Sequence, residues 1–118
     1  IPLRDNSADG ILSIASFHHL ATVERRMKAL TEMKRLLKTD GIILLSVWSI
    51  RQPKKLKKKY RFHFGDNIVK WTIPDGETYD RYYYIFSVEE LYHLFNIAGL
   101  NVIKHFWEYG NEVFIIRK

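Results

Sequence analysis

The sequence predicts an α/β fold whose elements follow the order strand, helix, strand, insertion, helix and antiparallel hairpin. Two short apolar runs, residues 11–16 and 42–48, flank a segment of helical periodicity, and a crossover of that length joins parallel strands. Two β-rich runs joined by a glycine-containing turn close the chain. With 118 residues, 47% of them apolar, we expect one domain with one core over residues 1–118.

The first three elements form a strand, a helix and a second strand. Residues 11–16 are mostly apolar, as expected for a strand buried on both faces of a parallel sheet. Thr22 is the expected N-cap of an amphipathic helix, and basic and glycine stop signals at residues 38–41 should end it. Residues 42–48 then form the second strand. The apolar positions that define the helix are Met27, Leu30, Met33 and Leu37.

An insertion rich in basic and aromatic residues separates this unit from the last elements. It covers about residues 51–86, and turn signals at residues 74–76 are consistent with a short hairpin inside it.

The chain should end in a helix and an antiparallel hairpin. Ser87 and Glu90 form a capping box at the start of the helix, and Gly99 can end it. Residues 100–107 and 112–116 are the two expected strands.

Composition excludes several classes of protein. The chain has no cysteine, so it can hold neither a disulfide framework nor a Cys-based zinc site, and its histidines lack ligand spacing; we expect no metal. No apolar run reaches the roughly 20 residues that span a bilayer. We therefore expect no membrane association and a cytoplasmic location.

The net charge of +6 has one source, because residues 51–61 hold seven bases and no acid, which leaves fewer bases than acids elsewhere.

Four segments resemble S-adenosylmethionine-dependent methyltransferases of the Rossmann-like class I, and among them the tRNA wobble-uridine carboxymethyl methyltransferases. Two of these segments, the first and second along the chain, are shared by many small-molecule methyltransferases. The HHLAT-ERR continuation of the first segment, together with VKW and RYYY, narrows the resemblance to the tRNA enzymes. Departures from the family pattern occur at Ala8, at residues 39–40 and at Lys70. The segments are PLRDNSAD leading into SIASFHHLATVERR, LLKTDGIILLSVW, DNIVKW and RYYYIF.

The resemblance implies a partial Rossmann-like methyltransferase sheet, consisting of the last four of seven strands with the final strand antiparallel. It implies S-adenosylmethionine as cofactor, tRNA as partner and, in this family, a small activator subunit. The family's glycine-rich loop is not found, because the six glycines lie singly at turns. Since the chain begins at Ile1, we expect it to be the C-terminal half of a single methyltransferase domain, whose N-terminal half is missing.

Residues at the end of the first strand are the expected cofactor contacts. Ligands of open α/β sheets bind beyond the carboxyl ends of the strands. By the resemblance, Ser13, Ile14 and Ala15 would line the methionine and ribose side of S-adenosylmethionine. His18 and His19 follow, and at most one of two adjacent histidines should reach the site; we expect His18 to shape the junction with the cofactor. The alternative for either is a structural or capping histidine.

Arginine and aromatic residues are the expected substrate contacts. Arg25 and Arg26 lie in the first helical turn, where a cation is unfavourable beside the positive helix end. Each therefore either binds phosphate or carboxylate or pairs with Glu24 or Asp5. By the resemblance, Arg81 would hold the carboxylate of a modified wobble base, while Trp71 and Tyr82 would sandwich the base. The alternative for these aromatic residues is a small hydrophobic cluster.

The lysine run Lys57, Lys58 and Lys59 is followed by aromatic residues, a mixture suited to phosphate contact and base stacking. The alternative is a solvated loop. Two other functions remain open at this level: a small-molecule methyltransferase acting on a quinone-like acceptor, and a non-catalytic fragment that binds RNA or a partner. The small-molecule methyltransferase function does not explain the seven basic residues in the insertion.

Overall fold

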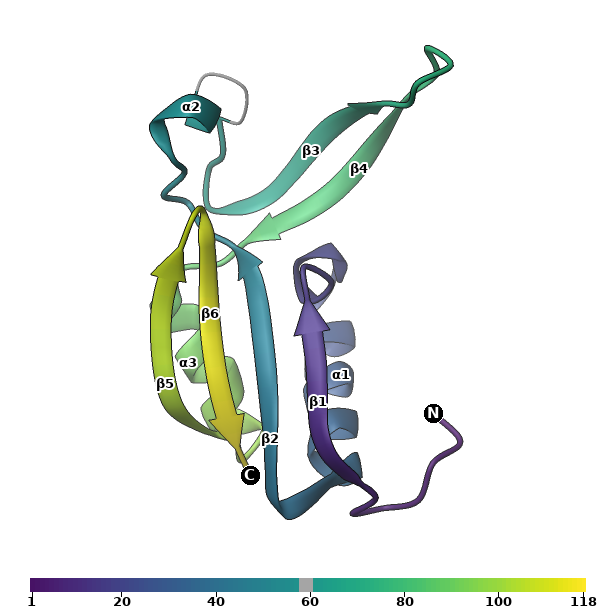
Figure 1. Ribbon diagram of the computed structural model, residues 1–118, viewed down its shortest axis with the longest axis vertical. Helices are drawn as coiled ribbons and strands as arrows, with labels where there is room; N and C mark the ends of the chain where they lie inside the picture. The colour runs from purple at the N-terminus through teal and green to yellow at the C-terminus, as the bar shows by residue number, and fades with distance from the viewer. Residues whose placement is uncertain (58–60) are drawn as a thin grey trace.

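The computed structural model describes residues 1–57 and 61–118, without the side chain of Lys57. Its elements form a four-stranded sheet, a separate two-stranded hairpin and two main helices (Figure 1). The strand order in the larger sheet is β1-β2-β6-β5, and the hairpin consists of β3 and β4. The elements are β1 (Ala8–Ile14), η1 (Phe17–His19), α1 (Val23–Leu36), β2 (Leu37–Trp48), α2 (Lys54–Lys57), β3 (Gly65–Thr72), β4 (Thr78–Ile85), α3 (Val88–Ile97), β5 (Asn101–Glu108) and β6 (Asn111–Arg117).

The parallel strand-helix-strand unit is confirmed, with different strand limits. Strand β1 pairs with β2 in parallel, with Ile14 opposite Ser46, and α1 makes the crossover. Strand β1 stops before Ala15, whose φ of 53° turns the chain out of the extended conformation. Strand β2 begins at Leu37, five residues before the expected start, so Gly41 lies inside a strand and does not end the helix. A Cβ there would come within 2.5 Å of the Leu37 side chain, so the close packing requires glycine.

Both expected helix caps are present. The Thr22 hydroxyl accepts a hydrogen bond from the Arg25 amide at 3.2 Å, and the Ser87 hydroxyl accepts one from the Glu90 amide at 3.1 Å. Each bond satisfies an amide that has no partner within the first helical turn. Gly99, with φ of 74°, follows α3 in the left-handed conformation typical of a helix end.

The terminal hairpin is also confirmed. Strands β5 and β6 pair antiparallel, and Tyr109 and Gly110 form a turn with positive φ at both positions. The right-handed twist of the strands favours this type of turn. Strand β6 inserts between β2 and β5, so the sheet is parallel at one edge and antiparallel at the other.

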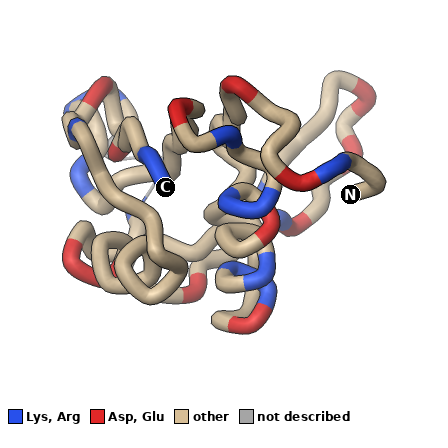
Figure 2. Tube along the Cα trace, turned by 90° about the horizontal axis from the view of Figure 1, so that it is seen from below, with Lys and Arg blue, Asp and Glu red and all other residues tan. Residues whose placement is uncertain are grey.

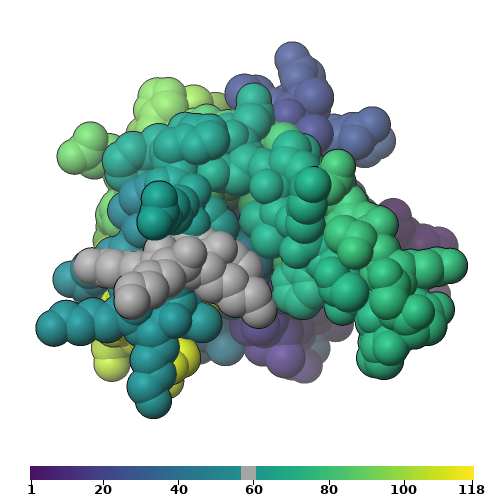
Figure 3. All heavy atoms as spheres, turned by 90° about the horizontal axis from the view of Figure 1, so that it is seen from above, coloured from purple at the N-terminus to yellow at the C-terminus, as the bar shows by residue number. Residues whose placement is uncertain are grey.

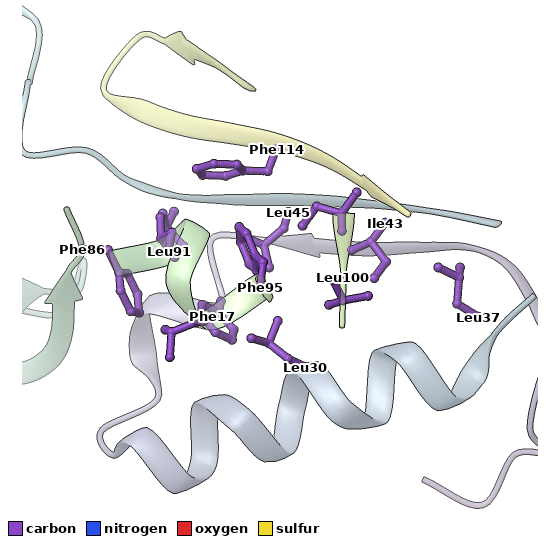
Figure 4. Packing of buried hydrophobic residues seen from close by; sticks show 13 residues of the cluster. Phe17, Leu30, Leu37, Ile43, Leu45, Phe86, Leu91, Phe95, Leu100 and Phe114 are labelled. Atoms are coloured by element: carbon purple, nitrogen blue, oxygen red, sulfur yellow. The ribbon is translucent and has the colours of Figure 1, made fainter. Parts of the chain in front are cut away.

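One face of the large sheet carries the hydrophobic core. Alternate residues of β2 and β6, such as Ile43, Leu45 and Phe114, point toward α1 and α3 and are fully buried (Figure 4). The expectation that the first strand is buried on both faces is wrong for the described chain. Leu12 is 76% exposed and Ile14 is 53% exposed, because both helices cover the same face (Figure 1).

Candidate active site

The segment after β1 lies between the large sheet and the hairpin. Ala15, in the left-handed conformation, directs the chain into η1, and the Ala15 amide donates to the Ser46 carbonyl at 3.1 Å. Figure 1 shows η1 between the tip of β1 and the start of the hairpin. The two histidines of η1 are therefore located at the carboxyl edge of the sheet, where ligands bind in this class of fold.

His18 is completely buried at this edge. Its Nδ1 atom accepts a hydrogen bond from the Trp48 amide at 2.9 Å, which leaves the proton of the neutral ring on Nε2. Burial, followed by the neighbouring charge of His19, lowers the pKa of His18 to about 3. Among the described residues, Nε2 is a buried donor with no hydrogen-bond partner. His18 is thus neutral and enclosed, and its expected contact with the cofactor stays a prediction.

His19 is the member of the pair that reaches a surface hollow. The hollow has a volume of about 400 Å³ and is lined by His19, Asp80, Arg81 and Tyr82. His19 Nδ1 lies 2.8 Å from the Tyr82 carbonyl, and since a carbonyl only accepts, this nitrogen carries the proton. In the neutral ring the lone pair is then on Nε2. The sequence predicted that at most one of the two histidines reaches the site and favoured His18, whereas in the structure it is His19 that lines the hollow.

Arg81 lies on the face of the hairpin that also carries Trp71. Its guanidinium carbon is 5.0 Å from the centre of the Trp71 ring and 5.9 Å from that of Tyr79. Among the described residues Arg81 makes no ion pair, and its side chain is exposed. An exposed arginine stacked on an aromatic ring keeps its donors available for a planar anion.

Tyr82 does not share this face. In the hairpin register Trp71 is opposite Tyr79 and Ile68 is opposite Tyr82, so Trp71 and Tyr82 point to opposite sides. The Tyr82 hydroxyl instead donates to Asp66 and accepts from Arg26. The expected base sandwich between Trp71 and Tyr82 is therefore wrong, although Tyr82 still borders the hollow.

An aromatic stack that sequence reasoning missed connects the hairpin to the sheet. The Trp48 and Tyr83 rings are parallel within 3° at a centroid distance of 3.9 Å, and Phe62 stacks on Trp48 at 5.1 Å. Tyr83 also contacts both histidines of η1, with centroid distances of 4.9 Å to His18 and 4.4 Å to His19. The position of Trp48 at the end of a strand was the available signal, but its partners come from a distant segment.

The end of β1 offers a partial fit to S-adenosylmethionine. Ile14 presents an exposed apolar side chain, while Ser13 is buried and its hydroxyl lies 3.1 Å from that of Ser16. Residues 13–16 include no acid that could bind the ribose hydroxyl groups. These residues fit van der Waals contact along one side of the cofactor, which is the role expected of Ser13, Ile14 and Ala15.

Arg25 lies apart from the hollow that Arg81 lines. It is exposed on α1 and borders a separate hollow together with Ile1, Leu20 and Glu32. Arg81 and Arg25, either of which was expected to orient a carboxylate, therefore lie at separate hollows. The role of Arg25 stays a prediction.

The basic segment is fixed at its root. Gln52 Nε2 donates to the Ser49 and Gly110 carbonyls at 2.6 and 2.9 Å, and the guanidinium carbon of Arg51 lies 4.5 Å from the Trp107 ring centre. Lys58, Lys59 and the side chain of Lys57 lie outside the described residues.

Two further views show the surface at the hairpin end of the molecule and the distribution of charged residues. Seen from above, the α2 segment and the β3–β4 hairpin form most of this end of the molecule (Figure 3). From below, basic and acidic positions are interspersed (Figure 2). Helix α2, which carries Lys54 and Lys55, lies at the same end of the molecule as the β3–β4 hairpin (Figure 1).

Among the described residues, no three His, Asp or Glu side chains are grouped as a metal site would require. Within the same residues, no helix has the length and apolar character needed to cross a membrane.

Comparison with known proteins identifies the fold. The methyltransferase domain family matches residues 1–45. A solved S-adenosylmethionine-dependent methyltransferase of Methanosarcina mazei superposes on all of the chain with a TM-score of 0.75 at 20% identity, and the chain covers 62% of that protein. The chain has a methyltransferase fold. A 1,6-didemethyltoxoflavin-N1-methyltransferase of Burkholderia thailandensis, solved with S-adenosylhomocysteine, gives a TM-score of 0.65 at 19% identity; the match covers 97% of the chain and 45% of that protein.

Curated relatives point to methyltransferases as well. A methyltransferase-named protein of Encephalitozoon cuniculi is 36% identical over 109 residues, which are 89% of the chain and 50% of the relative. The mouse tRNA (carboxymethyluridine(34)-5-O)-methyltransferase ALKBH8 is 48% identical over 61 residues, 51% of the chain and 9% of that protein. The chain thus spans half the length of the first relative and a small part of the second. The resemblance to methyltransferases that the sequence indicated is confirmed.

Proposed function

We propose that this chain supplies the C-terminal half of an S-adenosylmethionine-dependent methyltransferase that methylates a carboxymethyl-modified wobble uridine in tRNA. The observation that carries the proposal is the hollow at the carboxyl edge of the sheet, which both Arg81 and His19 line. The curated relatives whose names include this reaction are 42% to 48% identical over part of the chain, which supports the substrate class.

The residues present suit methyl transfer to a carboxylate. S-adenosylmethionine, held along one side by residues 13–15, would supply an electrophilic methyl group for a carboxylate oxygen, so that the products would be a methyl ester and a thioether. The carboxylate is already ionised at neutral pH, so the chain needs no general base. Its contribution is orientation.

Arg81 would orient the carboxylate. Its fork can donate two parallel hydrogen bonds to a carboxylate, and Trp71 beside it offers an aromatic surface for the base. Asp80 lines the same hollow and opposes an anion, so the arginine must supply the favourable charge. Residues 13–15 would contact the cofactor. Lys57, Lys58 and Lys59 would bind the tRNA backbone, and a small activator subunit and a cytoplasmic location remain part of the proposal.

The test compares methylation of tRNA by the complete wild-type enzyme and by the Arg81→Lys variant, which lacks the guanidinium group. We expect Arg81→Lys to lower kcat by about 10- to 100-fold, because charge is kept while the bidentate geometry is lost. The matched control is Arg117→Lys, at an exposed position on β6. Nucleoside mass spectrometry measures conversion of carboxymethyluridine to its ester.

Two outcomes would contradict the proposal. If the wild-type enzyme left the carboxymethyl group of tRNA unmodified but methylated small acceptors, the substrate class would be wrong. Equal turnover by the wild type and Arg81→Lys would remove Arg81 as the carboxylate ligand.

A further inference from the structure

Arg26 is a buried arginine at the junction of α1 and the β3–β4 hairpin. Its side chain is only 3% exposed, and among the described residues it forms no ion pair with a carboxylate. Taking a cation out of water is costly unless directional contacts replace the lost hydration. An apolar side chain of similar volume would fill this space at lower cost, so the contacts of the guanidinium need an explanation.

Those contacts are directed at the root of the hairpin. Arg26 Nε donates to the Leu20 carbonyl at 3.0 Å, and Nη2 donates to the Tyr82 hydroxyl at 3.3 Å. The guanidinium carbon lies 3.7 Å from the centre of the Tyr84 ring. One arginine of α1 thus contacts two alternate residues of β4 on a single face of the strand.

The charge of Arg26 is compensated through the two tyrosines. The Tyr82 hydroxyl donates to Asp66, and the Tyr84 hydroxyl donates to Glu90 Oε2 at 2.8 Å. Burial and then the hydrogen bond to Asp66 raise the pKa of Tyr82 to about 12, so this hydroxyl keeps its proton. Arg26 therefore links α1, both strands of the hairpin and α3 in one network.

This network bears directly on the candidate site. The Tyr82 main-chain carbonyl is bound to His19 Nδ1, and Arg81 precedes Tyr82 in the strand. Because successive side chains of a strand point to opposite faces, holding Tyr82 on one face holds Arg81 on the other. A slip of β4 by one residue would turn Arg81 away from the hollow.

We propose that Arg26 is a positioning residue, which fixes Tyr82 so that Arg81 and His19 border the same hollow. This inference rests on the proposed function, since it assigns a task to Arg81. Arg26 itself does not line the hollow, and it acts on Arg81 through its contact with Tyr82 in β4.

The test compares three substitutions in the complete enzyme. Arg26→Lys keeps the charge and loses the planar guanidinium group, and Arg26→Met keeps a similar volume and loses the charge. Tyr82→Phe removes only the hydroxyl. For all three we expect kcat on tRNA to fall at least tenfold, with KM for tRNA changed less than twofold, because misplacing the orienting group affects transfer more than binding. The matched control is Arg35→Met, an arginine of the same helix whose partners Glu32 and Asp5 lie away from the hairpin.

A purely structural role predicts a different pattern. It would lower the folded fraction, so rates normalised to the amount of cofactor-binding enzyme would equal the wild-type rate, and that result would overturn the proposal. The double variant Arg26→Met with Tyr82→Phe should be no slower than the slower single variant, since both substitutions remove the hydrogen bond between Arg26 and Tyr82. Multiplicative losses would also overturn it.

Hydrogen exchange separates this inference from the proposed function. In Arg26→Lys, amides of residues 78–85 should exchange at least tenfold faster than in the wild type, while those of residues 111–117 stay unchanged. If the enzyme proves inactive on tRNA but this local effect is present, the substrate is wrong and the positioning role holds. Unchanged exchange in residues 78–85 would refute the role of Arg26 whatever the substrate.

Discussion

The buried His18 should make the stability of the protein depend on pH. Its pKa is about 3 in the folded protein against an ordinary value near 6.5, so the unfolded chain binds the proton more readily. A lowered folded-state pKa means that the stabilising effect is complete above pH 6.5 and decreases as the pH falls toward 3. Proton linkage predicts a loss of about 1 kcal/mol at pH 6 and about 2 kcal/mol at pH 5 relative to pH 7.5.

The assay is urea unfolding of the wild type and His18→Asn at pH 7.5, 6 and 5. The Asn carbonyl can accept the hydrogen bond from the Trp48 amide, so the variant removes the titrating ring and keeps an acceptor. It should be less stable at pH 7.5, but its free energy of unfolding should fall about 2 kcal/mol less between pH 7.5 and 5. The other histidines are common to both proteins and cancel in the comparison. Equal pH dependence in the two proteins would refute the assignment of a neutral, buried His18.

Three further predictions concern the lysine run, the β5–β6 turn and the cofactor. Replacing Lys57, Lys58 and Lys59 by Gln should reduce the salt dependence of tRNA binding by roughly two to three units of the log–log slope, with an unchanged melting temperature; an unaltered slope would make the run a solvated loop. Gly110→Ala should destabilise the protein by about 1–3 kcal/mol in urea unfolding, because φ is 87° and the new Cβ would lie 2.5 Å from Gln52 Oε1; a neutral effect would contradict this turn geometry. The isolated chain should bind S-adenosylmethionine weakly or not at all by calorimetry, since it has no glycine-rich loop, and micromolar affinity would contradict a divided cofactor site.

Local signals in the sequence located most of the secondary structure. Thr22 and Ser87 mark the starts of their helices because a cap acts on amides within the next turn, which the sequence alone displays. Gly41 was misread for the opposite reason. Its role depends on the packing of Leu37 and the approach of β1, and neither can be inferred from neighbouring residues.

The candidate site was less predictable because its geometry depends on how the hairpin docks. The RYYY segment indicated that Arg81 and the tyrosines matter, but which of them share a face follows from the β3–β4 register. Similarly, the choice between His18 and His19 depends on Trp48 and Tyr83, which enclose one ring and leave the other beside the hollow. Arg26 could be noticed as an unfavourable charge in the first helical turn, yet its partners on the hairpin, Tyr82 and Tyr84, are more than 50 residues away.

The hairpin and the basic segment, and not the sheet edge, should determine which substrate is methylated. Solved structures that share this fold are only 10% to 22% identical to the chain, and one of them is named as a methyltransferase of a toxoflavin derivative. The shared fold is therefore compatible with an acceptor unlike a tRNA base. The residues that could distinguish a tRNA base from a small molecule lie between β2 and α3: Arg81 and Trp71 on the hairpin, and the lysines before it. Function in such folds depends on the site that the loops and insertions build. Substrate preference should therefore follow substitutions in residues 51–86, whereas changes at the end of β1 should affect cofactor binding for every acceptor alike.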